Sequence, residues 1–320
     1  MTKSYILVDG NSLGNFANGA RKLSIGDMPV QAIYGFLRTL HKTCATFAFS
    51  QPIVLWDGLS WRKKHFSDYK SNRDRVETKH EIRMAEERAL YHRQKPHIQR
   101  ALTHLGIPQV IANNMEADDL GAIMADRYAA QGAQVILFTG DKDWIQLVGP
   151  KVVWFDFANN RKITHKTFEE MTGVSTIRQF VEVKALSGDQ GDGIPGVGGL
   201  GEKGAKDFLA QYGSFNSFFE QVTFGEIKLD GLPKKIRALV EDETKALIFS
   251  RNLELMDLRT PARPKPEGLV IEKGTPSVDA FRDFCEDFMF RSFLQDLELW
   301  ISVFPAFKHQ SPLTNGATVA

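Results

Sequence analysis

Three short apolar runs in this chain are each followed, within three residues, by an aspartate. The runs are residues 5–8, 53–56 and 135–138, and the aspartates are Asp9, Asp57 and Asp141. Such runs are typical of strands covered on both faces. A Gly/Asn-rich loop and a helical pattern over residues 29–48 separate the first two runs, which predicts parallel βαβ units. Ligands of an open parallel sheet bind outside the carboxyl ends of its strands, so the three aspartates are expected at one binding edge.

Acidic residues gather in five short clusters that hold nine carboxylates. They are Asp9, Asp57, Glu116, Asp118, Asp119, Asp141, Asp143, Asp189 and Asp192. So many carboxylates cannot stay ionised close together unless cations compensate them. Hard oxygen ligands suit Mg²⁺ or Mn²⁺. The sequence therefore predicts a two-metal site that cleaves phosphodiesters.

Each cluster also has a simpler local interpretation. Residues 116–119 would lie in the first turn of a helix capped by Asn114, where acidic side chains complement the helix dipole. The acids after Gly140 and around Gly191 lie among turn-forming residues. One shared site accounts for all five clusters together, and it is the interpretation that we favour.

A basic segment follows the second run. Residues 61–100 hold twelve Lys or Arg against six Asp or Glu, whereas the whole chain has a net charge of +1. Lys70 and Arg73 have the spacing to share a helix face and to stabilise charge on a phosphate, and Tyr69 could stack on a base. The alternative is a solvated basic helix. We expect residues 61–95 to form a poorly buried helical excursion, with helices at 77–91 and 97–105.

The second half of the chain is predicted to be mostly helical, over residues 175–258. The string at 196–201 matches G-x-G-x-x-G, but no strand precedes it, which argues against a dinucleotide site. A glycine hairpin between two helices is the better interpretation, because its amides can hold a phosphate, with Lys203 and Lys206 adding charge. Residues 259–268 read as a proline-rich connector, 278–300 as amphipathic helices, and 309–320 as a disordered tail.

Two cysteines, Cys44 and Cys285, indicate neither a zinc site nor a disulfide framework. The N-terminus enters a strand directly, so no signal peptide is expected, and no apolar run has the length of a membrane span. We therefore expect a cytoplasmic protein without a membrane partner. Nothing in the sequence demands more than a monomer.

Seven segments together resemble the 5′-nuclease family, which includes flap endonucleases, bacteriophage 5′→3′ exonucleases and the nuclease domain of bacterial DNA polymerase I. They are YILVDGNSL, PVQAIYGFLRTL, WDGLSWRKKHFSDYKSNR, MEADDLGAIMA, FTGDKDWIQLV, ALSGDQGDGIPGVGGLGEKGAKDFL and QYGSF, in family order over residues 5–215. The resemblance implies an α/β fold whose central, mostly parallel sheet is flanked by helices. It also implies a helical arch and a C-terminal helix–three-turn–helix region.

The patterns along the chain, read with this resemblance, predict four parts. Residues 1–174 form an α/β core with the arch at 61–95, and residues 175–258 form a helical DNA-binding region with the hairpin at 187–211. Residues 259–308 form a connector with helices packed on the body, and residues 309–320 form the tail.

Site roles are implied in the same way. Asp9, Asp57, Glu116 and Asp118 look like ligands of one metal group with Asp119 beside it, and Asp141, Asp143, Asp189 and Asp192 look like the second. Tyr69, Lys70 and Arg73 match the basic motif at the base of the arch. The residues expected at the DNA interface are Arg62, Gly196, Gly198, Gly201, Lys203 and Lys206. The resemblance further implies K⁺ at the hairpin.

The activity so implied is Mg²⁺-dependent cleavage of DNA at 5′ ends, flaps, nicks and gaps, and of RNA paired with DNA. Gly191 and Gly193 depart from the family pattern, which has Ser and Asn there; no acidic position is lost. Two other functions stay open at this point. One is a PIN-type ribonuclease, and the other is a protein that binds DNA junctions without cutting them.

Overall fold

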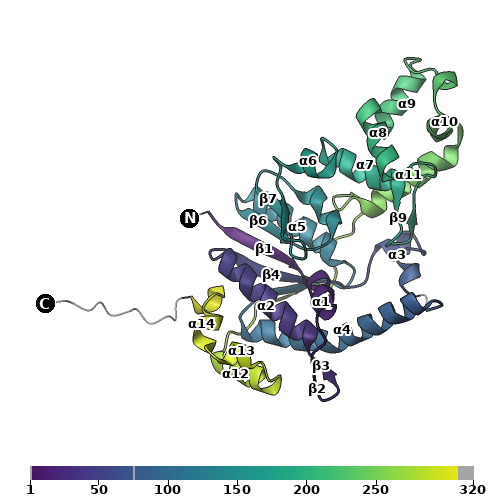
Figure 1. The fold of residues 1–320 in the computed structure, drawn as a ribbon. Helices are drawn as coiled ribbons and strands as arrows, with labels where there is room; N and C mark the ends of the chain where they lie inside the picture. The colour runs from purple at the N-terminus through teal and green to yellow at the C-terminus, as the bar shows by residue number, and fades with distance from the viewer. Residues whose placement is uncertain (1, 75, 309–320) are drawn as a thin grey trace.

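A seven-stranded, mostly parallel sheet forms the centre of the computed structural model, which describes residues 2–74 and 76–308 (Figure 1). The strand order is β11-β5-β4-β1-β6-β7-β8. The bounds are β1 Ser4–Asp9, β4 Gln51–Trp56, β5 Gln109–Ile111, β6 Gln134–Phe138, β7 Val152–Asp156, β8 Arg161–Ile163 and β11 Val270–Glu272. Strands β5, β4, β1, β6 and β7 run parallel, and the edge strands β8 and β11 are antiparallel to their neighbours. The predicted sheet is confirmed.

Successive residues of the central strand β1 belong to different cores, as the twofold alternation of a strand requires. Ile6 and Val8 pack with three helices: α1 (Gly10–Asn18), α2 (Gln31–Thr46) and α4 (Lys79–His104). Leu7 packs on the opposite face. The elements there are α5 (Ala117–Ala130), η2 (Lys142–Leu147) and α7 (Ile177–Ser187). Helices therefore cover both faces, and the carboxyl ends of the strands stay open at one edge.

The stretch after β1 is helix α1 and not the Gly/Asn-rich loop that we expected. Asp9 caps this helix, because its side chain accepts a hydrogen bond from the Ser12 amide. A Cβ added at Gly10 would lie 2.6 Å from the Trp56 ring, and one at Gly14 would lie 2.3 Å from the Tyr91 ring. The glycines are required because α1 packs tightly between strand β4 and helix α4, and this tertiary packing outweighs their poor helix propensity.

The basic excursion consists of α3 (Arg62–His65), η1 (Ser71–Asp74) and the first part of α4. Our prediction of two helices at 77–91 and 97–105 is wrong, because α4 is continuous and contains Pro96. Tyr91, Gln94 and Ile98 lie on either side of the proline and are all buried. Gln94 accepts a hydrogen bond from the Ala32 amide at 2.7 Å and donates to Asn18 at 3.0 Å. These contacts hold the helix together where proline removes one of its hydrogen bonds.

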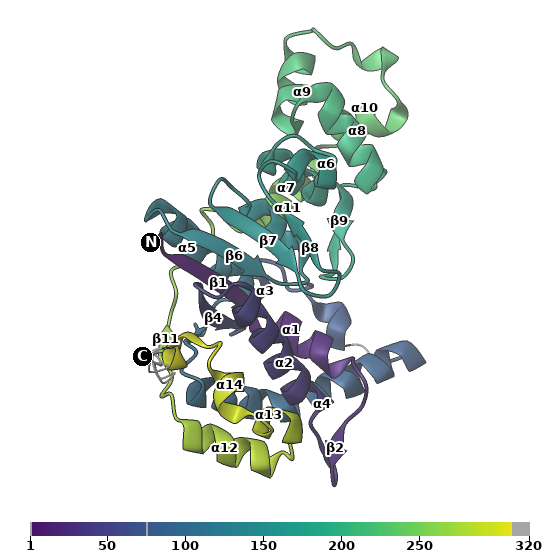
Figure 2. The ribbon, with the colours of Figure 1, turned by 60° about the vertical axis from the view of Figure 1, so that its left-hand side comes forward.

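Helices α8–α11 form a lobe that projects from the sheet core in both ribbon views (Figures 1 and 2). Their bounds are α8 Glu202–Tyr212, α9 Phe215–Thr223, α10 Lys234–Glu241 and α11 Glu243–Met256. Helix α7 and the two-stranded pair of β9 (Gly188–Asp189) and β10 (Ile194–Pro195) lead into it. The short elements α6 (Phe168–Thr172) and η3 (Leu229–Gly231) lie in the connections.

Helices α12–α14 lie at the other end of the molecule from this lobe (Figures 1 and 2). Their bounds are α12 Val278–Asp287, α13 Arg291–Leu294 and α14 Leu297–Ile301, and η4 (Pro305–Phe307) follows them. A separate small hairpin pairs β2 (Ser24–Ile25) with β3 (Met28–Pro29). Trp300 stacks on His41 of α2, with ring centroids 4.7 Å apart. The predicted tail at 309–320 lies outside the described residues. Within residues 2–74 and 76–308, every helix is too short or too polar to cross a membrane.

Candidate active site

Asp9 and Asp57 lie together where β1 and β4 end. Asp9 accepts hydrogen bonds from the Ser12 amide and the Thr139 hydroxyl, both at 2.9 Å. Asp57 accepts one from the Ala117 amide at 2.8 Å, which ties the start of α5 to the end of β4. Burial, and then the charge of Asp57, raise the pKa of Asp9 to about 6. The edge of the sheet therefore holds more negative charge than its own hydrogen bonds compensate.

Asp118 and Asp141 extend this negative site. Burial, and then Asp143, raise the pKa of Asp141 to about 7. Burial, and then Asp141, raise the pKa of Asp118 well above its usual value, although its Oδ1 accepts a hydrogen bond from Trp144 Nε1 at 2.7 Å. The charge of Asp9 raises the pKa of both. Carboxylates from β1, α5 and the loop after β6 thus lie close enough to repel one another.

Glu116, the N-cap of α5, differs because it is well compensated. Its Oε2 accepts hydrogen bonds from the Ser60 hydroxyl at 2.8 Å, Arg62 Nη1 at 3.0 Å and the Tyr69 hydroxyl at 3.0 Å. Its Oε1 contacts the Lys70 ammonium group. Burial opposes its ionisation, but Lys70 and Arg62 lower the pKa of Glu116 to about 2. Glu116 is therefore the point where the basic excursion is anchored to the sheet. Asn114, which we expected to cap α5, instead bonds to the backbone of the 259–268 connector.

Asp119 and Arg62 form a buried ion pair, with exposed fractions of 0% and 2%. Asp119 Oδ1 accepts from Arg62 Nη2 at 2.9 Å, and its Oδ2 accepts from Trp61 Nε1 and from the Glu116 amide, both at 3.2 Å. Arg62 Nε donates to the Leu255 carbonyl at 2.7 Å. We expected Asp119 at the metal and Arg62 on DNA, but in this structure both side chains are enclosed and their polar atoms are engaged with each other and with neighbouring groups.

A second acidic group forms where α7 and β9 meet the loop after β6. Lys184 of α7 contacts Asp143, and its Nζ lies 3.2 Å from Asp189 Oδ2. Asp189 also accepts a hydrogen bond from the Asp192 amide at 3.2 Å, and Asp192 pairs with Arg73 at 2.6 Å. Our sequence analysis missed Lys184. The available signal was a single lysine inside the apolar run Val183–Leu186 of a predicted helix, directly before the acidic loop.

The two groups border one small cavity of about 10 Å³, roughly the space of one water molecule or ion. Its carboxylates are Asp118, Asp143, Asp189 and Asp192. Among the described residues, no three His, Cys, Asp or Glu side chains are already arranged to hold a metal ion. Lys70 and Lys184 supply cationic charge between the carboxylates instead. The donors nevertheless suit Mg²⁺ or Mn²⁺, because they are hard carboxylate oxygens gathered in one place.

The three basic-motif residues lie beside this cavity, but not all of them are accessible. Tyr69, which we expected could stack on a base, is only 2% exposed, and its hydroxyl donates to Glu116 instead. Lys70 has a φ of 57°, and its amide donates to the Asp192 carbonyl at 2.8 Å. Arg73 is half-exposed and pairs with Asp192. The left-handed backbone at Lys70 is uncommon for a lysine, and it is held where its ammonium group reaches Glu116.

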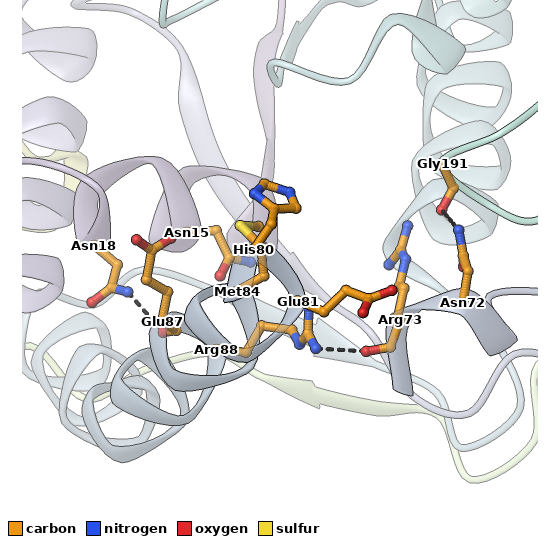
Figure 3. A pocket seen from close by; sticks show the side chains of 10 residues that line it. All are labelled: Asn15, Asn18, Asn72, Arg73, His80, Glu81, Met84, Glu87, Arg88 and Gly191. Carbon is orange, nitrogen blue, oxygen red and sulfur yellow. Dashed lines mark hydrogen bonds between the residues drawn. The ribbon is translucent and has the colours of Figure 1, made fainter. Parts of the chain in front are cut away.

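A larger cavity, of about 560 Å³, opens between α1, η1 and α4 (Figure 3). It is lined by Asn15, Asn18, Asn72, Arg73, His80, Glu81, Met84, Glu87, Arg88 and Gly191. Arg88 donates to the Arg73 carbonyl at 2.5 Å, and Asn72 donates to the Gly191 carbonyl at 3.3 Å, so both bonds brace its rim (Figure 3). Arg73 borders this cavity and also pairs with Asp192, so the cavity lies next to the acidic site.

Gly191 and Gly193, which depart from the family pattern, lie against η1. Gly193 has a φ of 70°, and a Cβ there would lie 3.0 Å from the Asp68 carbonyl oxygen. Asn72 Nδ2 donates to the Gln190 carbonyl at 2.9 Å, whereas Asn72 Oδ1 is buried and has no hydrogen-bond partner among the described residues. Glycine at 193 therefore suits the backbone but leaves a polar atom of Asn72 unpaired.

The glycine hairpin connects β10 to α8. A Cβ at Gly196 would lie 2.5 Å from the Ser187 carbonyl oxygen, so only glycine fits this approach. Gly198 has a φ of 83°, and Gly201 is the N-cap of α8. The hairpin predicted from the glycine spacing is thus present between two helices. This geometry excludes a dinucleotide fingerprint, because the two-residue strand β10 before it is no buried parallel strand.

The two lysines after the hairpin have different surroundings. Lys203 is exposed, whereas Lys206 pairs with Glu202 at 2.6 Å. Lys206 also lines a cavity of about 500 Å³ with Asp143 and Lys184. Lys206 therefore lies beside the second acidic group and Lys203 faces solvent.

The chain matches two successive parts of one protein family. Residues 4–173 match the 5′-3′ exonuclease N-terminal resolvase-like domain, and residues 175–276 match the 5′-3′ exonuclease C-terminal SAM fold. This chain belongs to the 5′-3′ exonuclease family. The predicted resemblance and fold class are confirmed.

Individual relatives show how far the likeness extends. A 5′-3′ exonuclease of Bacillus subtilis is 30% identical over 270 residues, which cover 80% of this chain and 84% of the relative. A thermostable DNA polymerase I of Thermus filiformis is 31% identical over 300 residues, which cover 93% of this chain but 33% of the relative. The chain thus spans about a third of the length of that polymerase.

The solved structures agree. A bacteriophage T5 flap endonuclease, in a pseudo-enzyme–product complex with DNA and metal ions, is 26% identical with a TM-score of 0.65. The likeness covers 90% of this chain and 98% of that one. A second structure of the T5 5′-exonuclease, with bound zinc, is 25% identical with a TM-score of 0.66 and the same coverage.

Proposed function

We propose that this chain is a Mg²⁺-dependent 5′→3′ exonuclease and 5′ flap endonuclease that hydrolyses DNA, with Mn²⁺ able to replace Mg²⁺. The observation that carries the proposal is the meeting of two acidic groups, from the sheet edge and from β9, on one small cavity beside Lys70 and Arg73. Carboxylates placed so close together repel one another, and a protein that only bound DNA would gain nothing from this repulsion. Family membership and the DNA and metal ions of the T5 complex support it.

We assign Asp9, Asp57, Glu116 and Asp118 to one metal group. Asp141, Asp143, Asp189 and Asp192 are assigned to the other. Bound divalent cations would neutralise these carboxylates and act as Lewis acids on the phosphodiester.

The chain's own contribution is then orientation and charge. Lys70 is paired with Glu116 and Arg73 with Asp192. Once these carboxylates were neutralised, both basic side chains would be free to contact the scissile phosphate. There they stabilise the negative charge that grows in the transition state. Tyr69 keeps Glu116 oriented through its hydroxyl.

We propose that the single-stranded 5′ end enters through the cavity of Figure 3, between α1 and α4. The duplex is held by the hairpin, where amides and Lys203 contact the phosphate backbone without reading bases. Contacts of this kind also admit an RNA segment paired with DNA, which suits primer removal in replication and repair. Residues 1–174 would then form the catalytic core, 175–258 the duplex-binding region and 259–308 a brace. All the residues that we assign to the site belong to one chain, so we propose a monomer that acts on DNA in the cytoplasm.

The resemblance also implies a K⁺ ion at the hairpin, held by backbone carbonyl oxygens. A potassium ion held by backbone needs several free carbonyl oxygens. The Val197 carbonyl instead accepts a hydrogen bond from Lys245 Nζ at 2.5 Å, and the Gly198 carbonyl accepts one at 3.5 Å. The hairpin therefore does not fit K⁺, and we leave this ion out of the function.

Cleavage of an end-labelled DNA with a single-stranded 5′ flap tests the proposal, with Mg²⁺, with EDTA, and with Asp141→Ala in Mg²⁺. We expect product only from the unmodified chain with Mg²⁺, cut near the junction or released stepwise from the 5′ end. Tight binding without product under every condition would favour a junction-binding protein. Equal cleavage of free single-stranded RNA would favour a PIN-type ribonuclease.

A further inference from the structure

Lys245 contacts the hairpin, although it lies 47 positions after Gly198 in the chain. It belongs to the first turns of α11. Its ammonium group donates to two successive hairpin carbonyls, those of Val197 and Gly198. A Cβ at Gly198 would lie 3.1 Å from this nitrogen, so a side chain at 198 would crowd the contact.

The backbone of the hairpin explains why its carbonyls are available. Gly198 and Gly199 have φ angles of 83° and 84°, a left-handed pair that only glycine adopts without cost. Neither a helix nor a sheet ladder uses the carbonyls of Val197 and Gly198 here, so they need another donor.

Lys245 forms no ion pair with a carboxylate among the described residues, and its side chain is half-buried. Asp242, a nearby N-cap, accepts hydrogen bonds from the Thr244 amide and hydroxyl. The Thr244 hydroxyl, and to a smaller extent the charge of Lys245, lower the pKa of Asp242, but its carboxylate does not contact the ammonium group. An ammonium group has three donors, so at least one N–H of Lys245 remains for a ligand beyond the two carbonyls.

We propose that the Lys245 ammonium group is a built-in monovalent cation at the glycine hairpin, bridging its carbonyls to a phosphate of the bound duplex. Hairpin and duplex then bind each other without K⁺. The inference rests on the proposed function for the duplex, and on the contacts above for the cation. It adds a DNA-binding residue that the glycine motif does not contain.

The test measures binding of a fluorescent flap DNA in EDTA at constant ionic strength, with K⁺, Na⁺ or tetramethylammonium as the salt cation. The unmodified chain should bind equally in all three salts, within about twofold. Lys245→Met should weaken binding on the order of tenfold in tetramethylammonium, since one phosphate contact is lost, and K⁺ should restore most of the loss. Lys228→Met is the matched control, because Lys228 is an exposed lysine of the same lobe. It should lose little affinity and gain nothing from K⁺.

A DNA-free measurement keeps the inference independent of the proposed function. The midpoint temperature of thermal unfolding of Lys245→Met should rise by about 2–4 °C when K⁺ replaces tetramethylammonium, whereas that of the unmodified chain should not change. Tighter binding or higher stability of the unmodified chain in K⁺ would overturn the inference, as would Lys245→Met behaving like Lys228→Met. Loss of Mg²⁺-dependent cleavage with these salt responses intact would count against the proposed function alone.

Discussion

The Lys184 ammonium group of helix α7 lies 3.2 Å from Oδ2 of Asp189 in strand β9. Lys184 is held at the same time by Asp143. Despite burial, which lowers it, these two carboxylates raise the pKa of Lys184 above its usual value. The second acidic group therefore carries its own cation when no metal is bound.

Replacing Lys184 by Met should destabilise the chain in EDTA and strengthen its response to Mg²⁺. The loss in EDTA should be about 1–3 kcal/mol, because two partly buried carboxylates lose their partner. Mg²⁺ would no longer compete with the ammonium group, so its stabilising effect should exceed that in the unmodified chain. Thermal unfolding with and without Mg²⁺ measures both effects. Lys142→Met, an exposed neighbour, is the control. An unchanged Mg²⁺ response in Lys184→Met would refute competition.

Arg62→Met should lower the free energy of unfolding by about 3–5 kcal/mol, because it leaves Asp119 as an uncompensated buried charge. The double variant Arg62→Met with Asp119→Leu should recover part of this loss, since no buried charge remains. Urea denaturation measures both values. DNA affinity of the folded Arg62→Met chain should stay within about twofold of the unmodified chain. A large loss of DNA affinity without a loss of stability would mean that Arg62 contacts DNA.

Gly193→Ala should destabilise the chain more than Gly193→Asn. Both side chains meet the φ of 70° and the tight approach of the Asp68 carbonyl. Asparagine tolerates this backbone better than alanine, and its amide can donate to the unpaired Asn72 Oδ1. We expect about 1–2 kcal/mol for Ala and less than half of that for Asn. Equal losses in chemical denaturation would mean that Asn72 gains no partner.

Asp156→Asn should cost stability at neutral pH but not in acid. Asp156 is buried, which alone would raise its pKa, but hydrogen bonds from Asn159, the Ala158 amide and Arg161 lower that pKa below 3.8. A carboxyl with a lowered folded-state pKa contributes stability above its unfolded pKa of about 4, and this contribution disappears as the pH falls through the folded value.

The difference between Asp156→Asn and the unmodified chain should therefore be about 1–3 kcal/mol at pH 7 and should shrink below pH 4. Urea midpoints measured from pH 7 to pH 3 give this difference. A difference that stays constant over that range would mean that shape, and not charge, is what Asp156 provides.

Much of the site could be predicted from the order of apolar runs and acids alone. The end of a parallel strand has a known position, so Asp9, Asp57 and Asp141 had to lie at one edge once the runs were identified as strands. The glycine hairpin was predictable for a similar reason, because closely spaced glycines favour a turn that other residues resist. In both cases a few neighbouring residues determine the local structure, and tertiary packing does not change it.

The roles of the charged side chains were decided by tertiary structure. Arg62 and Tyr69 look like surface residues in a basic segment, but the fold encloses both against Glu116. Lys184 and Lys245 looked unremarkable in their helices, and each reaches an acidic group or a carbonyl pair only because α7 and α11 pack beside β9 and the hairpin. Partners that lie tens of residues apart leave no periodic trace in the sequence.

The sequence by itself determined the parallel strands that carry the acids, the edge where those acids gather and the turn of the hairpin, because strand runs and glycine conformations act over a few residues. Tertiary structure alone decided that α1 and α4 are continuous helices, through the close packing of Gly14 against Tyr91. It alone decided which cation faces which carboxylate, because Coulomb interactions depend on distance in space and not on separation along the chain.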